Sequence, residues 1–188
     1  MTVAIDVHHR LFSVRDYYRM AEAGILGEDD RVELIEGEII EMAPIGPRHA
    51  STVDRLGAVL SDSVRGKLIV RVQNPLRISE VSEPQPDLML LHPRDDFYAA
   101  DHPAPEDVLL VIEVADSSAG YDRSIKLPLY ARAGVLEVWL IYVGLPEVEI
   151  YREPSPTGYA SKRTAGQAEN LPIPGLGGVR VSVKDLLG

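Results

Sequence analysis

The stretch VLLVIEVADSSAGYDRSIK, residues 108–126, begins as a buried strand that carries a carboxylate. Six of its first seven residues are apolar, and the exception is Glu113. A strand covered on both faces reads as a continuous apolar run, and an ionised carboxylate there is costly unless it is paired or binds a metal. The sequence predicts a central strand over 108–115. Glu113 is then a metal ligand, the partner of an arginine, or a residue on a solvent-facing side.

A helix is predicted directly after this strand, over residues 122–133, with Gly134 as its end. Asp122 and Lys126 are four residues apart, so on a helix they share one face. Taken alone, such a pair is most simply a solvated ion pair. Pro128 removes a backbone donor and should kink the helix.

A second carboxylate, Asp87, stands at the start of the apolar segment PDLMLLH. Pro86 suits the first residue of a strand, which would place Asp87 at the mouth of that strand, although Pro-Asp can also be a simple turn. Asp87 and Glu113 on neighbouring strands, with Lys126 on the next helix, would converge on one point. Hard oxygen ligands favour Mg²⁺ or Mn²⁺ over zinc. A metal held in this way suits phosphodiester hydrolysis.

The remaining elements alternate between helix and strand. The helix over 48–66 has an apolar face at a 3.6-residue period, formed by Val53, Leu56, Leu60 and Val64. The other predictions are a capped helix over 13–24, a hairpin around Glu36-Gly37, and strands at 67–74, 76–79, 86–92, 136–143, 147–153 and 178–183. This order predicts an α/β or α+β domain around one mixed sheet.

The composition sets limits on the class of protein. A chain of 188 residues fits one domain, 1–188, and without cysteines it has no disulfides or thiolate metal sites. The net charge of −10 argues against a passive, charge-driven nucleic-acid binder. No apolar run approaches the length of a membrane span. The start MTVAIDVHHRLF lacks signal-peptide features, which predicts a cytoplasmic protein.

Five segments in a fixed order resemble the PD-(D/E)xK nuclease superfamily, and more closely a bacterial family of restriction-endonuclease-like proteins. The segments are ELIEGEIIEMAPIGPRHA, QPDL, VLLVIEVADSS, YDRSIKLPLYARAGVLEVWLI and IPGLGGVRVSVKDLL, within a core of about residues 10–187. The resemblance implies a restriction-endonuclease-like fold: a central mixed sheet flanked by helices, with an N-terminal helix and hairpin. It also implies a metal-dependent nuclease core.

The resemblance also suggests roles for individual residues. Asp87 matches the motif aspartate and Glu113 its second acidic residue, and both would bind Mg²⁺ or Mn²⁺. The motif lysine should follow Glu113 by two residues, but that position is Ala115. In this family a lysine on the next helix stands in, and Lys126 matches it.

Four further residues are auxiliary candidates. Glu33 and Glu38 in the hairpin can be additional ligands if the hairpin leans over the sheet, although most strand glutamates face water. His49 can contact a phosphate or act as an auxiliary base, or it can simply be a residue at the start of a helix. Asp122 is the fourth, through its place beside Lys126.

Three functions are compatible with these residues. The first is a Mg²⁺-dependent endonuclease acting on nucleic acid, with DNA as the expected substrate and a homodimer as the expected form, because cutting two strands favours two sites. The second is a catalytically inactive nuclease fold that serves as an oligomeric interaction or nucleic-acid-binding module. The third is a two-carboxylate glycoside hydrolase, which would need no metal.

Overall fold

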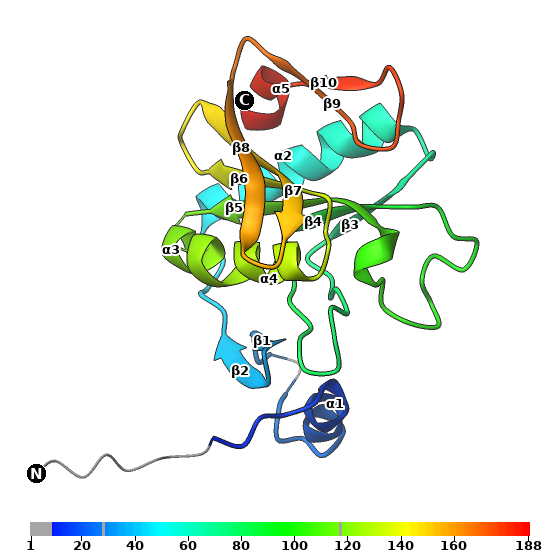
Figure 1. The fold of residues 1–188 in the computed structure, drawn as a ribbon, viewed down its shortest axis with the longest axis vertical. Coiled ribbons are helices and arrows are strands. Elements are labelled where there is room, and N and C mark those ends of the chain that lie inside the picture. Colours follow the sequence, from blue (N-terminus) through cyan, green and yellow to red (C-terminus); the bar gives the residue numbers. More distant parts are fainter. Residues whose placement is uncertain (1–8, 28, 117) are drawn as a thin grey trace, which may run out of the picture.

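A six-stranded mixed sheet crosses the centre of the computed structural model, which describes residues 9–27, 29–116 and 118–188 (Figure 1). The strand order is β3-β4-β5-β6-β7-β8, and β5–β6 is the parallel pair in an otherwise antiparallel sheet. The strands are β3 (Ile69–Val72), β4 (Leu88–Leu91), β5 (Val108–Ala115), β6 (Glu137–Tyr142), β7 (Glu147–Ser155) and β8 (Gly158–Gly166). Helices cover both faces, so the predicted mixed sheet flanked by helices is confirmed.

The strand β5 lies inside the sheet, and all eight of its residues are buried. It pairs with β4 on one side and β6 on the other, which explains its almost unbroken apolar sequence. Trp139 on β6 is also fully buried. The backbone of Glu113 is therefore held in the middle of the sheet, and its side chain is buried.

One face of the sheet is covered by α2 (Pro47–Val64). Its predicted apolar face, Val53, Leu56, Leu60 and Val64, is the face that it buries. The helix ends where Arg65 and Gly66 adopt left-handed conformations, with φ of 45° and 74°. Beside α2 lie α5 (Val183–Leu187) and the hairpin of β9 (Asn170–Pro172) and β10 (Arg180–Ser182).

The opposite face is covered by a composite helix that differs from the predicted one. The helix begins at Ala119, three residues before the predicted start, as α3 (Ala119–Tyr121), continues as a π-helical turn over Asp122–Lys126, and ends as α4 (Leu127–Arg132). The N–H of Leu127 donates to the carbonyl of Asp122, five residues earlier. A proline ring clashes with the preceding turn of an α-helix, so the wider turn accommodates Pro128.

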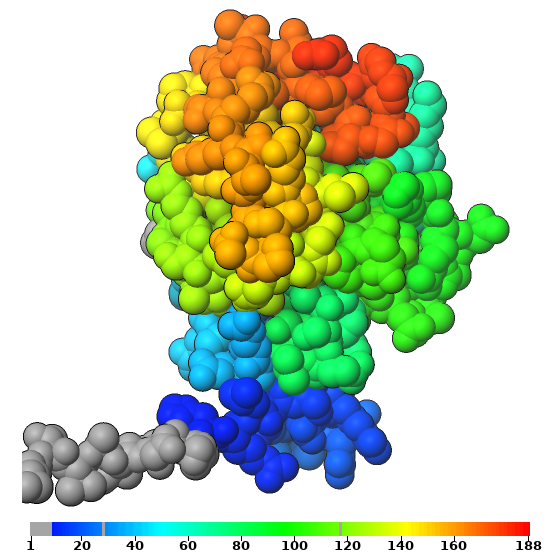
Figure 2. Space-filling view, viewed as in Figure 1, coloured from blue at the N-terminus to red at the C-terminus, as the bar shows by residue number. Residues whose placement is uncertain are grey.

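The N-terminal part of the described chain packs against the sheet through a hairpin and a loop. The capping box of Ser13 and Asp16 begins α1 (Val14–Glu22), as predicted. The hairpin of β1 (Val32–Ile35) and β2 (Glu38–Glu41) turns at Glu36-Gly37. A Cβ at Gly37 would lie 2.5 Å from the Cβ of Leu11, so the turn requires glycine. Figure 2 shows the hairpin beside the loop of residues 73–87, between α1 and the sheet.

One predicted strand is absent from the part of the chain that the structure describes, and three elements were not predicted. Residues 76–79 do not form a strand, because their backbone bonds close a tight turn with residues 82–84. The region after residue 154 contains β8, β9 and α5 in addition to the predicted last strand. Among the described residues, no helix is long and apolar enough to cross a membrane. Residues 1–8, which make up most of the N-terminal segment MTVAIDVHHRLF, lie outside the described residues, so the structure does not bear on the signal-peptide prediction.

Candidate active site

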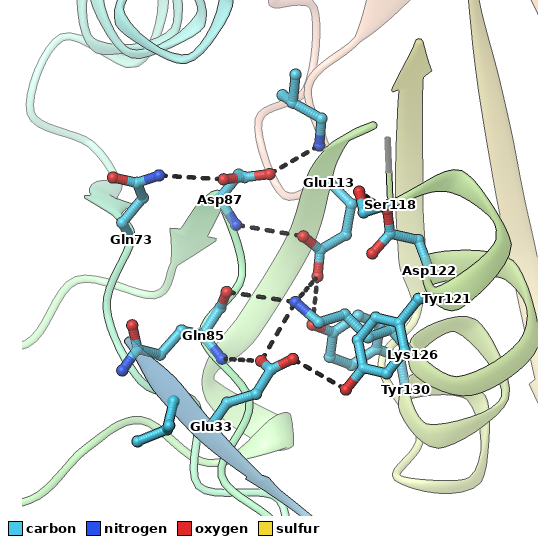
Figure 3. Close-up of polar contacts among 12 residues, drawn as sticks. Glu33, Gln73, Gln85, Asp87, Glu113, Ser118, Tyr121, Asp122, Lys126 and Tyr130 are labelled. Atoms are coloured by element: carbon cyan, nitrogen blue, oxygen red, sulfur yellow. Dashed lines mark hydrogen bonds and ion pairs between the residues drawn. The ribbon is translucent and has the colours of Figure 1, made fainter. Parts of the chain in front are cut away.

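Asp87 and Glu113 meet where β4 begins and β5 ends. The pairing of Leu88 with Ile112 brings Asp87 beside Glu113. The backbone N–H of Asp87 lies 3.4 Å from Oε2 of Glu113, and the N–H of Val114 donates to Oδ2 of Asp87 at 2.9 Å. Each carboxylate thus contacts the backbone of the other's strand, so the two groups are held in a fixed relation (Figure 3).

Lys126 reaches this pair from the π-helical turn and is almost fully buried. Its Nζ lies 3.2 Å from Oε1 of Glu113 and 3.3 Å from Oε2 of Glu33. The Nζ also lies 3.5 Å from the carbonyl oxygen of Gln85 (Figure 3). The lysine therefore stands between two buried carboxylates, one from the sheet and one from the N-terminal hairpin.

Glu33 is the residue that joins the hairpin to the site. It is buried, its Oε2 accepts from the N–H of Gln85 at 3.0 Å, and its Oε1 accepts from the hydroxyl of Tyr121 at 3.0 Å. Glu38, on the other strand of the hairpin, is exposed and does not line the pocket at the site. The structure therefore brings Glu33 to the site and leaves Glu38 in solvent.

His49 lies in the first turn of α2 and contacts Asp87. Its Nε2 is 3.1 Å from Oδ2 of Asp87, while Gln73 donates to Oδ1 at 3.3 Å. The hydrogen bond to Asp87 raises the pKa of His49, with burial opposing it. The Nδ1 of His49 is buried and has no hydrogen-bond partner among the described residues, so Asp87 is the polar contact of this side chain.

Two further hydroxyls hold the carboxylates in place. Tyr130, fully buried on α4, donates to Oε1 of Glu113 at 2.6 Å. Asp122 is buried and accepts from the hydroxyl of Ser118 at 2.6 Å. Asp122 and Lys126 do not form the solvated pair that their spacing suggests: both side chains are buried, and Lys126 contacts Glu113 and Glu33.

The two central carboxylates have opposite protonation tendencies. Burial raises the pKa of Glu113 to about 8, although Lys126 acts in the other direction. Burial also acts against ionisation of Asp87, but His49, the N–H of Val114 and Lys126 outweigh it and lower the pKa of Asp87. Burial disfavours charge on Lys126 too, yet Glu113, Glu33, Asp122 and Asp87 outweigh it and raise the pKa of the lysine, which favours its charged form. Opposed shifts of neighbouring carboxyls are typical of acid–base sites.

A pocket of about 440 Å³ opens onto these groups. Its polar lining includes Glu33, His49, Asp87, Glu113, Asp122 and Lys126. The loop from Met42 to Gly46, between β2 and α2, forms another wall. The site is therefore a concave, acidic surface with one buried cation at its base.

The donor set fits a magnesium-type ion. Among the described residues, no three histidine or carboxylate side chains converge as a preformed cage. Mg²⁺ does not require such a cage, because it binds through one or two carboxylates and keeps waters or phosphate oxygens as its other ligands. Oε2 of Glu113 and Oδ1 of Asp87 have only long hydrogen bonds, of 3.4 Å and 3.3 Å, so both oxygens retain capacity for a cation.

The sequence did not identify the residues whose side chains donate hydrogen bonds to the carboxylates of the site. Tyr130, Tyr121 and Gln73 have no motif of their own, and their contacts depend on tertiary packing. Ala115, which replaces the motif lysine, is buried at the end of β5 beside Tyr142 of β6. The Nζ of Lys126 reaches Glu113 from the covering helix instead.

Comparison with known proteins adds two findings. A family model described as "Putative restriction endonuclease", Uma2, matches residues 14–184. The fold is similar to a solved structure, "a putative nuclease belonging to DUF820 from Anabaena variabilis ATCC 29413", with a TM-score of 0.69. The two chains are 17% identical, over 94% of this chain and 97% of the other, so this likeness concerns the fold. No curated protein matches the chain.

Proposed function

This chain belongs to the Uma2 family, and from that premise we propose that it is a metal-dependent nuclease that hydrolyses phosphodiester bonds, with DNA as its substrate. The observation that supports the proposal most is the meeting of Asp87, Glu113 and Lys126, from three separate elements, in one pocket. The order of these residues in the sequence does not require this; the fold brings them together.

We assign the metal to Asp87 and Glu113. A bound Mg²⁺ or Mn²⁺ would offset phosphate charge and lower the pKa of a water molecule. Asp87 is ionised and ready to bind a cation, whereas Glu113 must first lose the proton that burial favours. Binding of the cation should therefore release a proton.

Lys126 acts in this proposal as a fixed positive charge. Because its pKa is raised, it cannot accept a proton from water near neutral pH. Its ammonium group can donate to an oxygen of the scissile phosphate and stabilise the charge that develops there. Glu33 and Glu113 hold the ammonium in place, and His49 and Gln73 orient Asp87.

Plasmid cleavage tests this proposal. The unaltered protein should nick or cut the plasmid with Mg²⁺ or Mn²⁺ and not with a chelator, and Asp87→Ala should remove the activity. A matched control is Asp185→Ala, a change of the same residue type on α5, which does not line the pocket. Equal cleavage by the unaltered protein and Asp87→Ala would refute the assignment. Activity on glycosides that resists chelation would support the carbohydrate alternative, and metal-independent binding without cleavage would support the inactive module.

The homodimer remains part of the proposal. A duplex has two strands, and two copies of the site would cut both. Sedimentation velocity of the protein alone and with duplex DNA tests this point, and a single monomeric species under both conditions would contradict it.

A further inference from the structure

A second group of charged side chains lies on the same face of the sheet as the proposed catalytic pocket. Its centre is Glu149 of β7, which is buried. Oε1 of Glu149 contacts Nη2 of Arg123 at 2.7 Å and Nζ of Lys162 at 2.9 Å. Oε2 accepts from the hydroxyls of Tyr151 at 2.7 Å and Tyr142 at 3.1 Å. We refer to these five residues as the Glu149 cluster.

The cations of this cluster exceed what Glu149 can satisfy. A carboxylate has about four lone-pair positions, and the four donors fill them. Burial opposes ionisation, but Lys162, Tyr151 and Arg123 lower the pKa of Glu149, so the cluster carries two cations against one anion. The other N–H groups of Arg123 and Lys162 keep their hydrogen-bonding capacity, and the two side chains are 48% and 46% exposed.

These unused donors border a hollow of about 400 Å³. Its lining includes Arg123, Leu127, Tyr151, Thr157, Tyr159 and Lys162, so it lies between α4 and the turn that joins β7 to β8 (Figure 1). Acidic side chains are absent from its described lining, in contrast to the catalytic pocket. The hollow therefore offers a net positive charge and free donors to an anion.

The sheet fixes the separation of Glu113 and Glu149, the central carboxylates of the two groups. Glu113 pairs with Leu140, and Leu140 pairs with Glu149, so the two glutamates lie in one row, on one face, two strands apart. At about 4.8 Å per strand, their backbones are about 10 Å apart. The π-helical turn crosses this row and supplies a cation to each glutamate, Lys126 to Glu113 and Arg123 to Glu149.

We propose that the hollow beside the Glu149 cluster binds a phosphate of the nucleic-acid strand that flanks the phosphate at the catalytic pocket. The inference rests on the proposed function, since it assumes a nucleic-acid substrate. The separation of about 10 Å between the two glutamate backbones corresponds to about three nucleotide steps along one strand of a duplex, at about 3.4 Å each, and to fewer steps in an extended strand. The hollow gives this acidic protein a local positive site where its substrate needs one.

The salt dependence of binding tests the proposal. The probe is fluorescein-labelled single-stranded DNA of mixed sequence, titrated by anisotropy at several KCl concentrations in a chelator, so that no strand is cut. Lys162→Gln should lower the slope of log K against log salt by about 0.7, the value for one phosphate contact on a single strand. Lys162→Arg should retain the slope, because it keeps the charge.

Arg163→Gln is the matched control. Arg163 is adjacent to Lys162 on β8, and its side chain is similarly exposed, at 44%. The substitution removes the same charge as Lys162→Gln, but Arg163 pairs with Glu169 instead of Glu149. It lies opposite Ile150, whose side chain belongs to the other face of the sheet. Circular dichroism of each variant confirms folding, and if Lys162→Gln fails to fold, Arg123→Gln replaces it with the same expected slope.

Four outcomes decide the matter. A slope lowered by Lys162→Gln and not by Arg163→Gln supports the proposal, even if plasmid cleavage is never observed. Equal slopes for the two variants overturn it, even if cleavage is normal. Absence of DNA binding by the unaltered protein also overturns it. Calorimetric binding of inorganic phosphate that Lys162→Gln removes, with unchanged DNA slopes, would assign the hollow to a small phosphate compound and overturn the nucleic-acid assignment.

Discussion

The protonation of Glu113 gives a prediction about stability. In the metal-free protein its pKa is raised to about 8 from 4.5, so folding favours the protonated form. The stabilisation by this proton is complete below the pKa that Glu113 has in the unfolded chain. It is lost as the pH rises through the pKa that Glu113 has in the folded protein. Between pH 5 and pH 8 the change amounts to about 3 to 4 kcal/mol, at about 1.4 kcal/mol for each pH unit of pKa difference. The groups that shift the pKa of Glu113 are unchanged when Glu113 itself is replaced; they are Lys126, Asp87, Asp122 and Tyr130.

The variant Glu113→Gln isolates this contribution. Its amide oxygen can accept from Tyr130 and it does not titrate. Urea unfolding in a chelator, at pH 5, 6, 7 and 8, measures the free energy of unfolding of both proteins. The unaltered protein should lose about 3 to 4 kcal/mol more than the variant over this range. His49 and other groups titrate in both proteins and cancel in the comparison. Parallel pH profiles for the two proteins would refute the reasoning.

Three further predictions concern the same structure. Lys126→Met should lower the free energy of unfolding at pH 7 by about 3 to 5 kcal/mol, because it removes the buried ammonium that contacts Glu33 and Glu113; urea unfolding measures this, and a loss below 1 kcal/mol would contradict it. Tyr130→Phe should cost about 1 to 3 kcal/mol in the same assay, since it removes a donor to Glu113, and an unchanged midpoint would count against that contact. Leu60→Ala should cost about 2 to 5 kcal/mol, because the side chain is fully buried under the sheet; a neutral result would contradict the packing of α2.

Periodicity in the sequence was sufficient for the central elements. The buried run of β5 and the apolar face of α2 were predicted because their patterns repeat over many residues. The strand β8 was missed because its sequence, GYASKRTAG, is polar and small, and its pairing with β7 decides its structure. The composite helix begins early, at Ala119, and contains a π-helical turn, and the local pattern reveals neither feature.

The candidate site was predicted in part. Asp87, Glu113 and Lys126 were identified from chemistry and resemblance, and the structure places them together. The burial of Glu33 against Lys126 could not be read from the sequence, because it depends on how the hairpin packs on the loop of residues 73–87. Tyr130 and Tyr121 were missed for the same reason, since nothing local distinguishes a tyrosine that donates to a carboxylate from one that fills a core.

The measurement that tests the central claim most directly is calorimetric titration with Mn²⁺ at pH 7, in two buffers of different ionisation enthalpy. The account predicts binding with release of about one proton, because the cation displaces the proton that burial favours on Glu113. Binding should be lost in Asp87→Asn, and the proton release should be lost in Glu113→Gln. Absence of binding by the folded protein, or equal binding by Asp87→Asn, would contradict a metal site at these two carboxylates.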